Sequence, residues 1–300
     1  MLEIVDLDVV INNKLILDGI TIKIKKGQIH GLVGPNGAGK TTLIKTIINI
    51  IKGKKGRVLF NGKEMNINNV KIGYMPDVIE PYDFMTSYEY LSFISSSTGI
   101  KKSNNEINKI LELVGLNVDK KIGDYSRGMK QRLGLAQAII GNPDILICDE
   151  PVSSLDPEGR REIYNIILSL KNEMVILISS HILDDVQHIC DDITIINKGH
   201  VVVSKNIRNL ISEKKQMKII FKDSNDMRKL DFCGSKKLDE TSILIENVDD
   251  KSVKKIFERF CELNVFPIHF GINSKSLEEK YMELINEDNR INKERNNRIN

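Results

Sequence analysis

The chain has 300 residues, of which 41% are hydrophobic and 28% are charged. This composition is typical of a globular protein with room for one large domain and a smaller appendage, and it excludes general disorder. The formal net charge of +3 is too small to indicate nucleic acid or anionic lipid as a general partner.

The first 30 residues predict β-structure, because apolar and polar residues alternate at 2–5 and 20–24 and an apolar run follows at 29–33. The N-terminus has neither a basic start nor a continuous apolar segment, so we expect no secretory signal. No stretch approaches the roughly 20 apolar residues that span a bilayer. Any membrane connection would therefore come through a partner or a surface contact.

Residues 34–41 read Gly-Pro-Asn-Gly-Ala-Gly-Lys-Thr, which matches the phosphate-loop pattern GxxxxGK[ST] between a predicted strand and a predicted helix. Glycines let the backbone direct N–H groups at phosphate oxygens, Lys40 neutralises phosphate charge, and Thr41 offers a Mg²⁺ ligand. A glycine-rich turn that only capped a helix would not require the lysine. The loop predicts ATP or a close relative as ligand, bound by Gly34, Pro35, Asn36, Gly37, Ala38, Gly39, Lys40, Thr41 and Thr42.

The next segments predict a hairpin and then a helical insert. Residues 56–60 and 63–65 flank Asn61-Gly62, which favours a type I′ turn. The region of about 81–140 is mostly helical in pattern. Its aromatic and methionine side chains suit either an interface or packing inside the insert. They are Tyr82, Phe84, Met85, Tyr88, Tyr90 and Phe93.

Three short apolar runs, at 145–148, 175–179 and 193–196, predict parallel strands buried on both faces, so the core is α/β. The first run ends in Asp149 and Glu150, which we interpret as one carboxylate for Mg²⁺, held through its water shell, and one for the attacking water. Two solvated charges at a strand end are the alternative interpretation.

After about residue 204 the pattern changes to a small α+β appendage, and the last residues are nearly all polar. We expect a nucleotide-binding domain at 1–205, the appendage at 206–286 and a disordered tail at 287–300. The four cysteines form no CxxC pair, which argues against a disulfide framework or a thiolate metal site.

Five motifs occur in the order found in ABC-type ATPases: the phosphate loop, a Ser-x-Gly before a helix at 126–128, Asp149-Glu150, Ser-Leu-Asp at 154–156, and His181. The resemblance covers about residues 1–205. It implies a P-loop NTPase core with a mostly parallel sheet, an N-terminal antiparallel β subdomain, the helical insert and the appendage. Read locally, Ser126 and Asp156 are helix N-caps.

In that family the segment resembling Ser126, Arg127, Gly128 and Met129 is the signature, which contacts nucleotide held by an opposing subunit. The resemblance therefore implies that function requires a pair of chains. It also implies that Ser154, Leu155 and Asp156 form the D-loop between the two sites. His181 would contact the γ-phosphate and act in catalysis together with Glu150.

Two positions depart from the family pattern. Asp77 stands where the family commonly has glutamine; it could still bind Mg²⁺ or water, but it adds negative charge beside Asp149 and Glu150. A turn residue after Pro76 is the alternative. Ile11 stands where the family usually stacks an aromatic ring on adenine, and an aliphatic side chain predicts weaker base recognition.

The resemblance implies an ATP- and Mg²⁺-dependent subunit of an ABC transporter at the cytoplasmic face of the membrane. It would form a homodimer, or a heterodimer with another ATPase subunit, and drive a separate multi-span permease. The Tyr-Ser-x-Gly-Met pattern at 125–129 and the segment 276–281 resemble bacterial exporters of drugs, antibiotics, peptides or lipids. No nucleic acid is expected. The alternatives are a soluble ATPase of DNA repair or ribosomes, and an ATP sensor without turnover.

Overall fold

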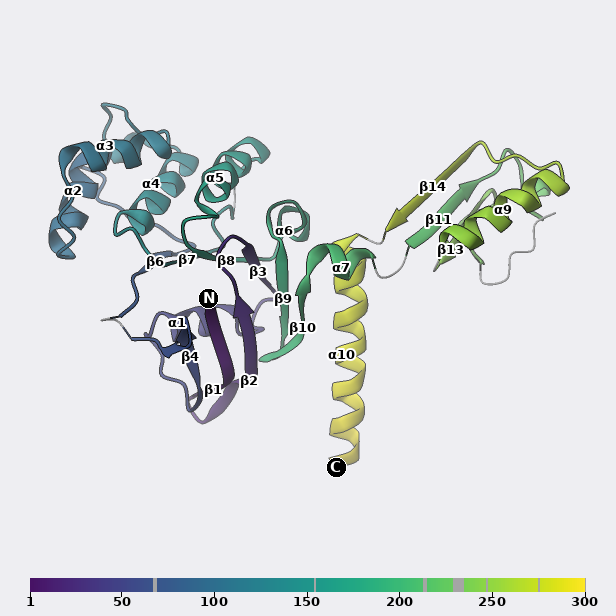
Figure 1. Cartoon of the computed structure of the whole chain (residues 1–300), viewed down its shortest axis with the longest axis horizontal. Coiled ribbons are helices and arrows are strands. Elements are labelled where there is room, and N and C mark those ends of the chain that lie inside the picture. Colours follow the sequence, from purple (N-terminus) through teal and green to yellow (C-terminus); the bar gives the residue numbers. More distant parts are fainter. Residues whose placement is uncertain are drawn as a thin grey trace. The chain divides into compact units, whose positions relative to one another are not determined.

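The structure, a computed structural model, describes residues 1–66, 69–153, 155–212, 215–228, 235–246, 248–274 and 276–299. The chain divides into two units (Figure 1), one of 1–205 together with 291–300 and one of 206–290. None of the helices in these ranges combines the length and the apolar character that a bilayer crossing requires.

An antiparallel sheet begins the first unit, as the alternating pattern predicts. Its strand order is β2-β1-β4-β5, and the bounds are β1 (Leu2–Ile11), β2 (Lys14–Ile24), β4 (Lys55–Phe60) and β5 (Lys63–Glu64). Asn61 and Gly62 join β4 to β5 with φ of 51° and 77°, so both occupy the left-handed region that a type I′ turn requires. The predicted hairpin is confirmed.

The second sheet carries the site. Its order is β10-β9-β3-β8-β7-β6, and its strands are β3 (Ile29–Val33), β6 (Ile72–Met75), β7 (Ile145–Asp149), β8 (Val175–Ser180), β9 (Asp192–Asn197) and β10 (His200–Asn206). The strands β6, β7, β8, β3 and β9 run parallel. Because parallel strands end at one edge, the residues that follow β3, β6, β7 and β8 meet there.

Helix α1 (Lys40–Ile47) packs between the two sheets (Figure 1). Its Leu43, Ile44 and Ile47 are buried in one apolar cluster with β1 and β2 on one side and with Ile145 and Ile147 of β7 on the other. The helix that follows the phosphate loop is thereby fixed against both sheets, and so is the loop itself.

The helical insert contains α2 (Ser87–Ser97), α3 (Asn104–Leu113), a short 3₁₀ helix (Ile122–Asp124) and α4 (Arg127–Ile139). Capping boxes begin α2, at Thr86 and Glu89, and α3, at Ser103 and Glu106. The three α-helices bury their own apolar cluster. The remaining helices of this unit are α5 (Pro157–Leu170) and α6 (Leu183–Ile189).

The second unit is built on a four-stranded sheet of order β12-β13-β11-β14. Its strands are β11 (Lys215–Ile220), β12 (Ser235–Lys237), β13 (Ser242–Glu246) and β14 (His269–Ser274). Its helices are α7 (Ile207–Ser212), α8 (Ser224–Arg228), α9 (Asp250–Glu262) and most of α10 (Leu277–Ile299). Phe221 and Phe260 are almost fully buried in its core.

The C-terminal end differs from the expectation of a disordered tail at 287–300, because α10 continues through Ile299. A helix satisfies its own backbone N–H and C=O groups, and Glu, Lys and Arg have high helix propensity. The polar composition therefore removes the possibility of a core but not that of a helix.

Candidate nucleotide site

The phosphate loop joins the buried strand β3 to α1, and two of its glycines are required by space. A Cβ on Gly34 would lie 2.2 Å from the carbonyl oxygen of Ile196, and one on Gly39 would lie 2.6 Å from a methyl of Leu17. Gly39 also has a φ of 108°, which side chains rarely adopt. The loop therefore holds its shape only with glycine at these positions.

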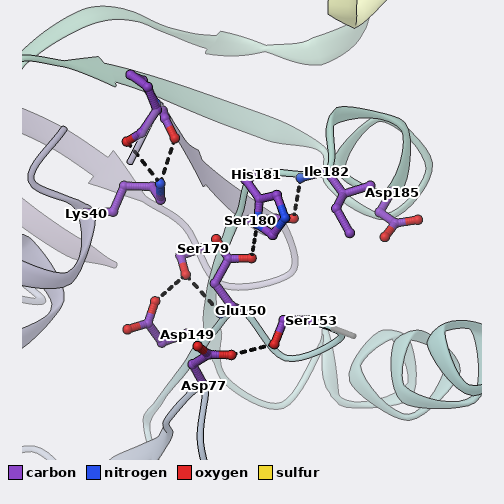
Figure 2. A network of polar contacts seen from close by, with 12 residues as sticks. Lys40, Asp77, Asp149, Glu150, Ser153, Ser179, Ser180, His181, Ile182 and Asp185 are labelled. Atoms are coloured by element: carbon purple, nitrogen blue, oxygen red, sulfur yellow. Dashed lines mark hydrogen bonds and ion pairs between the residues drawn. The ribbon is translucent and has the colours of Figure 1, made fainter. Parts of the chain in front are cut away.

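Lys40 is held inside the loop. Its ammonium donates to the carbonyl oxygens of Gly34 at 2.6 Å and Pro35 at 3.4 Å, the bonds drawn at the upper left of Figure 2. Burial lowers the pKa of Lys40, and the negative charges of Glu150 and Asp149 oppose this effect. The charge is thus presented to the cavity at a fixed position.

A cavity of about 310 Å³ opens over the loop. Its walls are Ile16, Pro35, Asn36, Gly37, Ala38, Gly39, Lys40, Thr41, Thr42, Asp77, Asp149 and Glu150. The nine residues predicted to bind nucleotide contribute eight of these positions, and the ninth, Gly34, lies beneath as the acceptor of the Lys40 bond. The structure thus brings the loop and all three predicted carboxylates to one cavity.

Asp149 ends β7 and is buried opposite Ser179 of the neighbouring strand β8. The hydroxyl of Ser179 donates to Oδ1 of Asp149 at 2.5 Å. The same hydroxyl accepts from the backbone N–H of Glu150 at 3.0 Å, so Ser179 fixes both acidic residues (Figure 2).

Glu150 leaves the strand with a φ of 51°, rather than continuing it. Its carboxylate lies 2.8 Å from Nδ1 of His181, which follows β8. The Glu150 side chain is mostly buried, at 16% exposed, whereas that of His181 is 57% exposed. The two residues predicted to be catalytic are therefore in direct contact, Glu150 at the cavity wall and His181 more exposed to solvent.

Asp77 follows β6 and makes two contacts that join separate parts of the first unit. Its carboxylate accepts a short hydrogen bond from the hydroxyl of Ser153, and its carbonyl oxygen accepts from the amide of Gln131 at 3.3 Å. Gln131 belongs to α4 and Ser153 follows Glu150. Asp77 therefore connects the cavity wall both to the helical insert and to the segment after Glu150.

The predicted signature residues Ser126, Arg127, Gly128 and Met129 lie at the start of α4, away from the cavity walls. The hydroxyl of Ser126 accepts from the backbone N–H of Met129 at 3.2 Å, as expected of an N-cap. Ser126 and Arg127 are exposed to solvent. The anion-favouring end of this helix thus faces out of the chain.

Of the predicted D-loop, Ser154 lies outside the described residues. Leu155 is buried, and the carboxylate of Asp156 accepts from the backbone N–H of Gly159 at 3.1 Å, which makes it the N-cap of α5. Arg160 donates to the carbonyl oxygen of Leu155 at 3.0 Å. The two described residues are therefore fixed by the start of α5.

The residue predicted to contact adenine, Ile11, is the last residue of β1 and is not among the cavity walls, whereas Ile16 of β2 is. Ser153 and Ser179 are also absent from the sequence-based prediction. A signal existed for Ser179, because it lies two residues before His181 at the end of an apolar run. For Ser153 and Ile16 no sequence pattern indicated a role.

Comparison with known proteins identifies relatives. The family model described as ABC transporter matches residues 17–153. An ABC transporter ATP-binding protein of Synechocystis is 33% identical over 90% of this chain and 78% of its own length. The lantibiotic transport ATP-binding protein SrtF of Streptococcus pyogenes is 38% identical over 68% of this chain and 90% of its own length. The bacitracin transport ATP-binding protein BcrA of Enterococcus faecalis is 42% identical over 65% of this chain and 66% of its own length.

Solved structures agree with this identification. An ATP-binding cassette of an ABC transporter in its ADP conformation has a TM-score of 0.64 and 26% identity, and the match covers 71% of this chain and 95% of that one. A dimeric bacterial ABC transporter cassette has a TM-score of 0.60, and the match covers 69% of this chain and 99% of that one. Because the two sequences are only 19% identical, this similarity shows the fold alone.

Proposed function

The chain belongs to the family of ABC transporter ATP-binding proteins, and on that premise we propose that its ATPase cycle drives a separate membrane protein that exports a peptide antibiotic or a similar amphipathic compound. The observation that carries the ATPase part is the convergence of Lys40, Asp149 and Glu150 at one cavity, with His181 in contact with the Glu150 carboxylate. Binding and hydrolysis of ATP are properties of the family.

In this proposal Lys40 and the backbone of the loop hold the phosphates, because the ammonium and the N–H groups at the start of α1 favour anions. Glu150 orients or deprotonates the attacking water, and His181 holds the Glu150 carboxylate in position. The fixed Asp149–Ser179–Glu150 arrangement keeps both carboxylates where charge develops in the reaction.

The residues at the cavity fit Mg²⁺. The carboxylate of Asp149 and the hydroxyl of Thr41 are hard oxygen donors, which this ion prefers. Within the described ranges no group of three or more His, Cys, Asp and Glu could hold a metal. The set at the cavity consists of the two oxygen donors of Asp149 and Thr41. That set suits an ion bound together with nucleotide phosphates, whose negative charge it would neutralise.

We place the second half of the site on a partner chain. The supporting observation is that Ser126 and Arg127 are exposed and lie outside the walls of the cavity in their own chain. A pair of chains could bring this helix start to the phosphates held by the opposite loop. The pair could be a homodimer or a heterodimer with a related ATPase subunit.

For the contact with the membrane protein we propose the aromatic side of the helical insert. Three rings lie together there, with centroids of Tyr82 and Phe84 at 5.8 Å and of Tyr82 and Phe93 at 5.7 Å. Phe84 is 71% exposed, and Val78, which precedes it in the chain, is 65% exposed. Exposed aromatic clusters are typical of interfaces. Such a contact would hold the chain at the cytoplasmic face of the membrane.

The cargo part of the proposal rests on the names of the relatives, since SrtF is a lantibiotic and BcrA a bacitracin transport ATP-binding protein. No residue of the nucleotide site is expected to contact cargo. Neither of these names points to DNA repair or to ribosomes.

The proposal is tested by mixing variants. We expect that Lys40→Ala in one chain and Ser126→Arg in the other leave one intact composite site per pair and restore ATPase activity to two inactive proteins. Simple averaging of the two inactive samples would refute the shared site. For the transport part, a multi-span membrane protein should co-purify with the tagged chain from membranes, and its retention should fall in a Phe84→Asp variant. A chain recovered only free of membranes would contradict this part while leaving the ATPase assignment intact.

A further inference from the structure

Strand β14 is an outer strand of the sheet in the second unit, and among the described strands it pairs only with β11 (Figure 1). An outer strand presents backbone N–H and C=O groups that have no partner within the sheet, and it can therefore template pairing with another strand. Whether it does so depends on the side chains that flank this edge.

Four alternate residues in and just before β14 are apolar and exposed. The exposed fractions are 63% for Phe266, 68% for Ile268, 48% for Phe270 and 44% for Ile272. Phe270 and Ile272 are alternate residues of β14 and point to one face of the sheet, and Phe266 and Ile268 precede them at the same spacing in the sequence. We refer to these four residues as the β14 row.

The row lies on the core face of the sheet. Phe270 is paired with Ile219 and Ile272 with Met217, and both of these β11 residues are buried beneath α9. Directly paired residues share a face of the sheet. The ring of Phe270 also meets that of Phe257 from α9, with centroids 4.9 Å apart. Helix α9 thus covers the inner strands β13 and β11, and the β14 row forms an exposed apolar surface beside the helix.

Strand β14 itself carries no charged residue and no proline, whereas Pro267, just before the strand, is a residue of the kind that commonly protects an edge. No Lys, Arg, Asp or Glu occurs from 263 to 274, although 28% of the chain is charged. Natural edge strands are commonly guarded by charged side chains, especially lysine. The uncharged strand edge and the exposed apolar residues therefore occur in the same segment of the chain.

We propose that β14 pairs antiparallel with β14 of a second copy of this chain. With His269 opposite His269 of the copy, Phe266 faces Ile272 and Ile268 faces Phe270, so every residue of the row meets an apolar partner. We favour a copy of this chain over another protein because in this register each apolar residue of one row faces an apolar residue of the other. Neither strand carries a carboxylate or ammonium group, so no like charges face each other. The two sheets become one, with both α9 helices on the same side.

The size of the contact sets its strength. At roughly 100 Å² of exposed area per side chain, the two rows bury about 800 Å² in total, which is half of a standard interface. We therefore expect a dimer with a dissociation constant in the micromolar range, formed without nucleotide. The β14 dimer can therefore be measured separately from any dimer that the nucleotide-binding domains form when ATP is bound.

The first test uses the full chain without nucleotide and with EDTA, by sedimentation velocity from about 1 to 100 μM. We expect a monomer–dimer equilibrium, and at least about a tenfold weaker one in Ile268→Lys and Phe270→Lys. Leu238→Lys is the control, because Leu238 is 45% exposed in the same unit but lies outside β14. Circular dichroism verifies folding of each variant. A purely monomeric wild type, or equal association of all four proteins, would overturn the proposal.

The second test measures the register. In a chain with Cys233→Ser and Cys261→Ser, we expect His269→Cys to form an intermolecular disulfide under mild oxidation, because residues that face each other across antiparallel strands have Cα separations within disulfide range. Lys222→Cys, at an exposed position outside β14, is the control. Equal cross-linking of the two variants would refute the register. Cross-linking of His269→Cys only to an added membrane protein would identify that protein as the occupant and refute the self-pairing.

Discussion

His30 provides a prediction whose magnitude follows from the structure. It lies in β3 four residues before Gly34, is only 2% exposed, and its Nε2 is 2.7 Å from the hydroxyl of Thr194. Its Nδ1 is buried without a hydrogen-bond partner. Burial lowers the pKa of His30 from the ordinary 6.5 to about 4, and the nearby charge of Asp192 opposes this only in part. The imidazole is therefore neutral in the folded chain.

This pKa makes stability depend on pH. The unfolded chain takes up a proton near pH 6.5 and the folded chain only near 4, so the contribution of His30 is complete above pH 6.5 and is lost as the pH falls toward 4. Between pH 7 and pH 4.5 the loss is about 2 kcal/mol, and below pH 4 it approaches about 3 kcal/mol. The folded sheet that holds the phosphate loop is the part affected.

The perturbation is His30→Gln, whose amide nitrogen can still reach Thr194 but does not titrate. Urea unfolding followed by circular dichroism at pH 7 and pH 4.5 gives the free energy of unfolding at each pH. We expect the wild type to lose about 2 kcal/mol more than the variant over this interval. His188→Asn is the matched control, since His188 has a 72% exposed side chain and its variant should keep the pH dependence of the wild type. Equal pH dependence in wild type and His30→Gln would refute the reasoning.

Three further predictions concern the nucleotide site. Glu150→Gln should slow ATP hydrolysis by roughly 10²-fold or more while ATP binding is kept, and unchanged turnover in a steady-state phosphate assay would remove Glu150 from its role. Ser179→Ala deletes the hydroxyl that contacts both Asp149 and the Glu150 N–H, so we expect Mg-ATP to bind about tenfold more weakly in fluorescent-nucleotide titrations. Ser180→Ala is the control variant, and equal affinities of the two variants would contradict this prediction. Because Ser153 donates to Asp77, the turnover of Asp77→Ala/Ser153→Ala should be no lower than that of Asp77→Ala alone, whereas multiplicative losses would show that the two residues act independently.

The parts of the site that the sequence predicted are those that need no knowledge of strand pairing. Glycine and lysine at fixed spacing define the loop locally, so Gly34 and Lys40 could be placed from the motif. The contact between Ser179 and Asp149 could not be predicted, because it depends on the register of β7 against β8. The same holds for Ser153, which is 76 positions from Asp77.

The sequence pattern places Asp149 and Glu150 together at the end of one strand. The strand instead ends at Asp149, and Glu150 turns away through the left-handed region. The turn brings its N–H to Ser179 and its carboxylate to His181. A sequence pattern cannot give this, because the φ of one residue at a strand end depends on the neighbouring strand.

The helix starts of the first unit offer an argument for the paired site. Helices α2, α3 and α5 carry an acidic residue in the first turn, namely Glu89, Glu106 and Glu158, and these neutralise the positive end of the helix. Among the described helices of eight residues or more in this unit, α1 and α4 have no such residue. The start of α1 faces the cavity of its own chain. The start of α4 is exposed and equally suited to an anion, and a phosphate held by a partner chain would complete it.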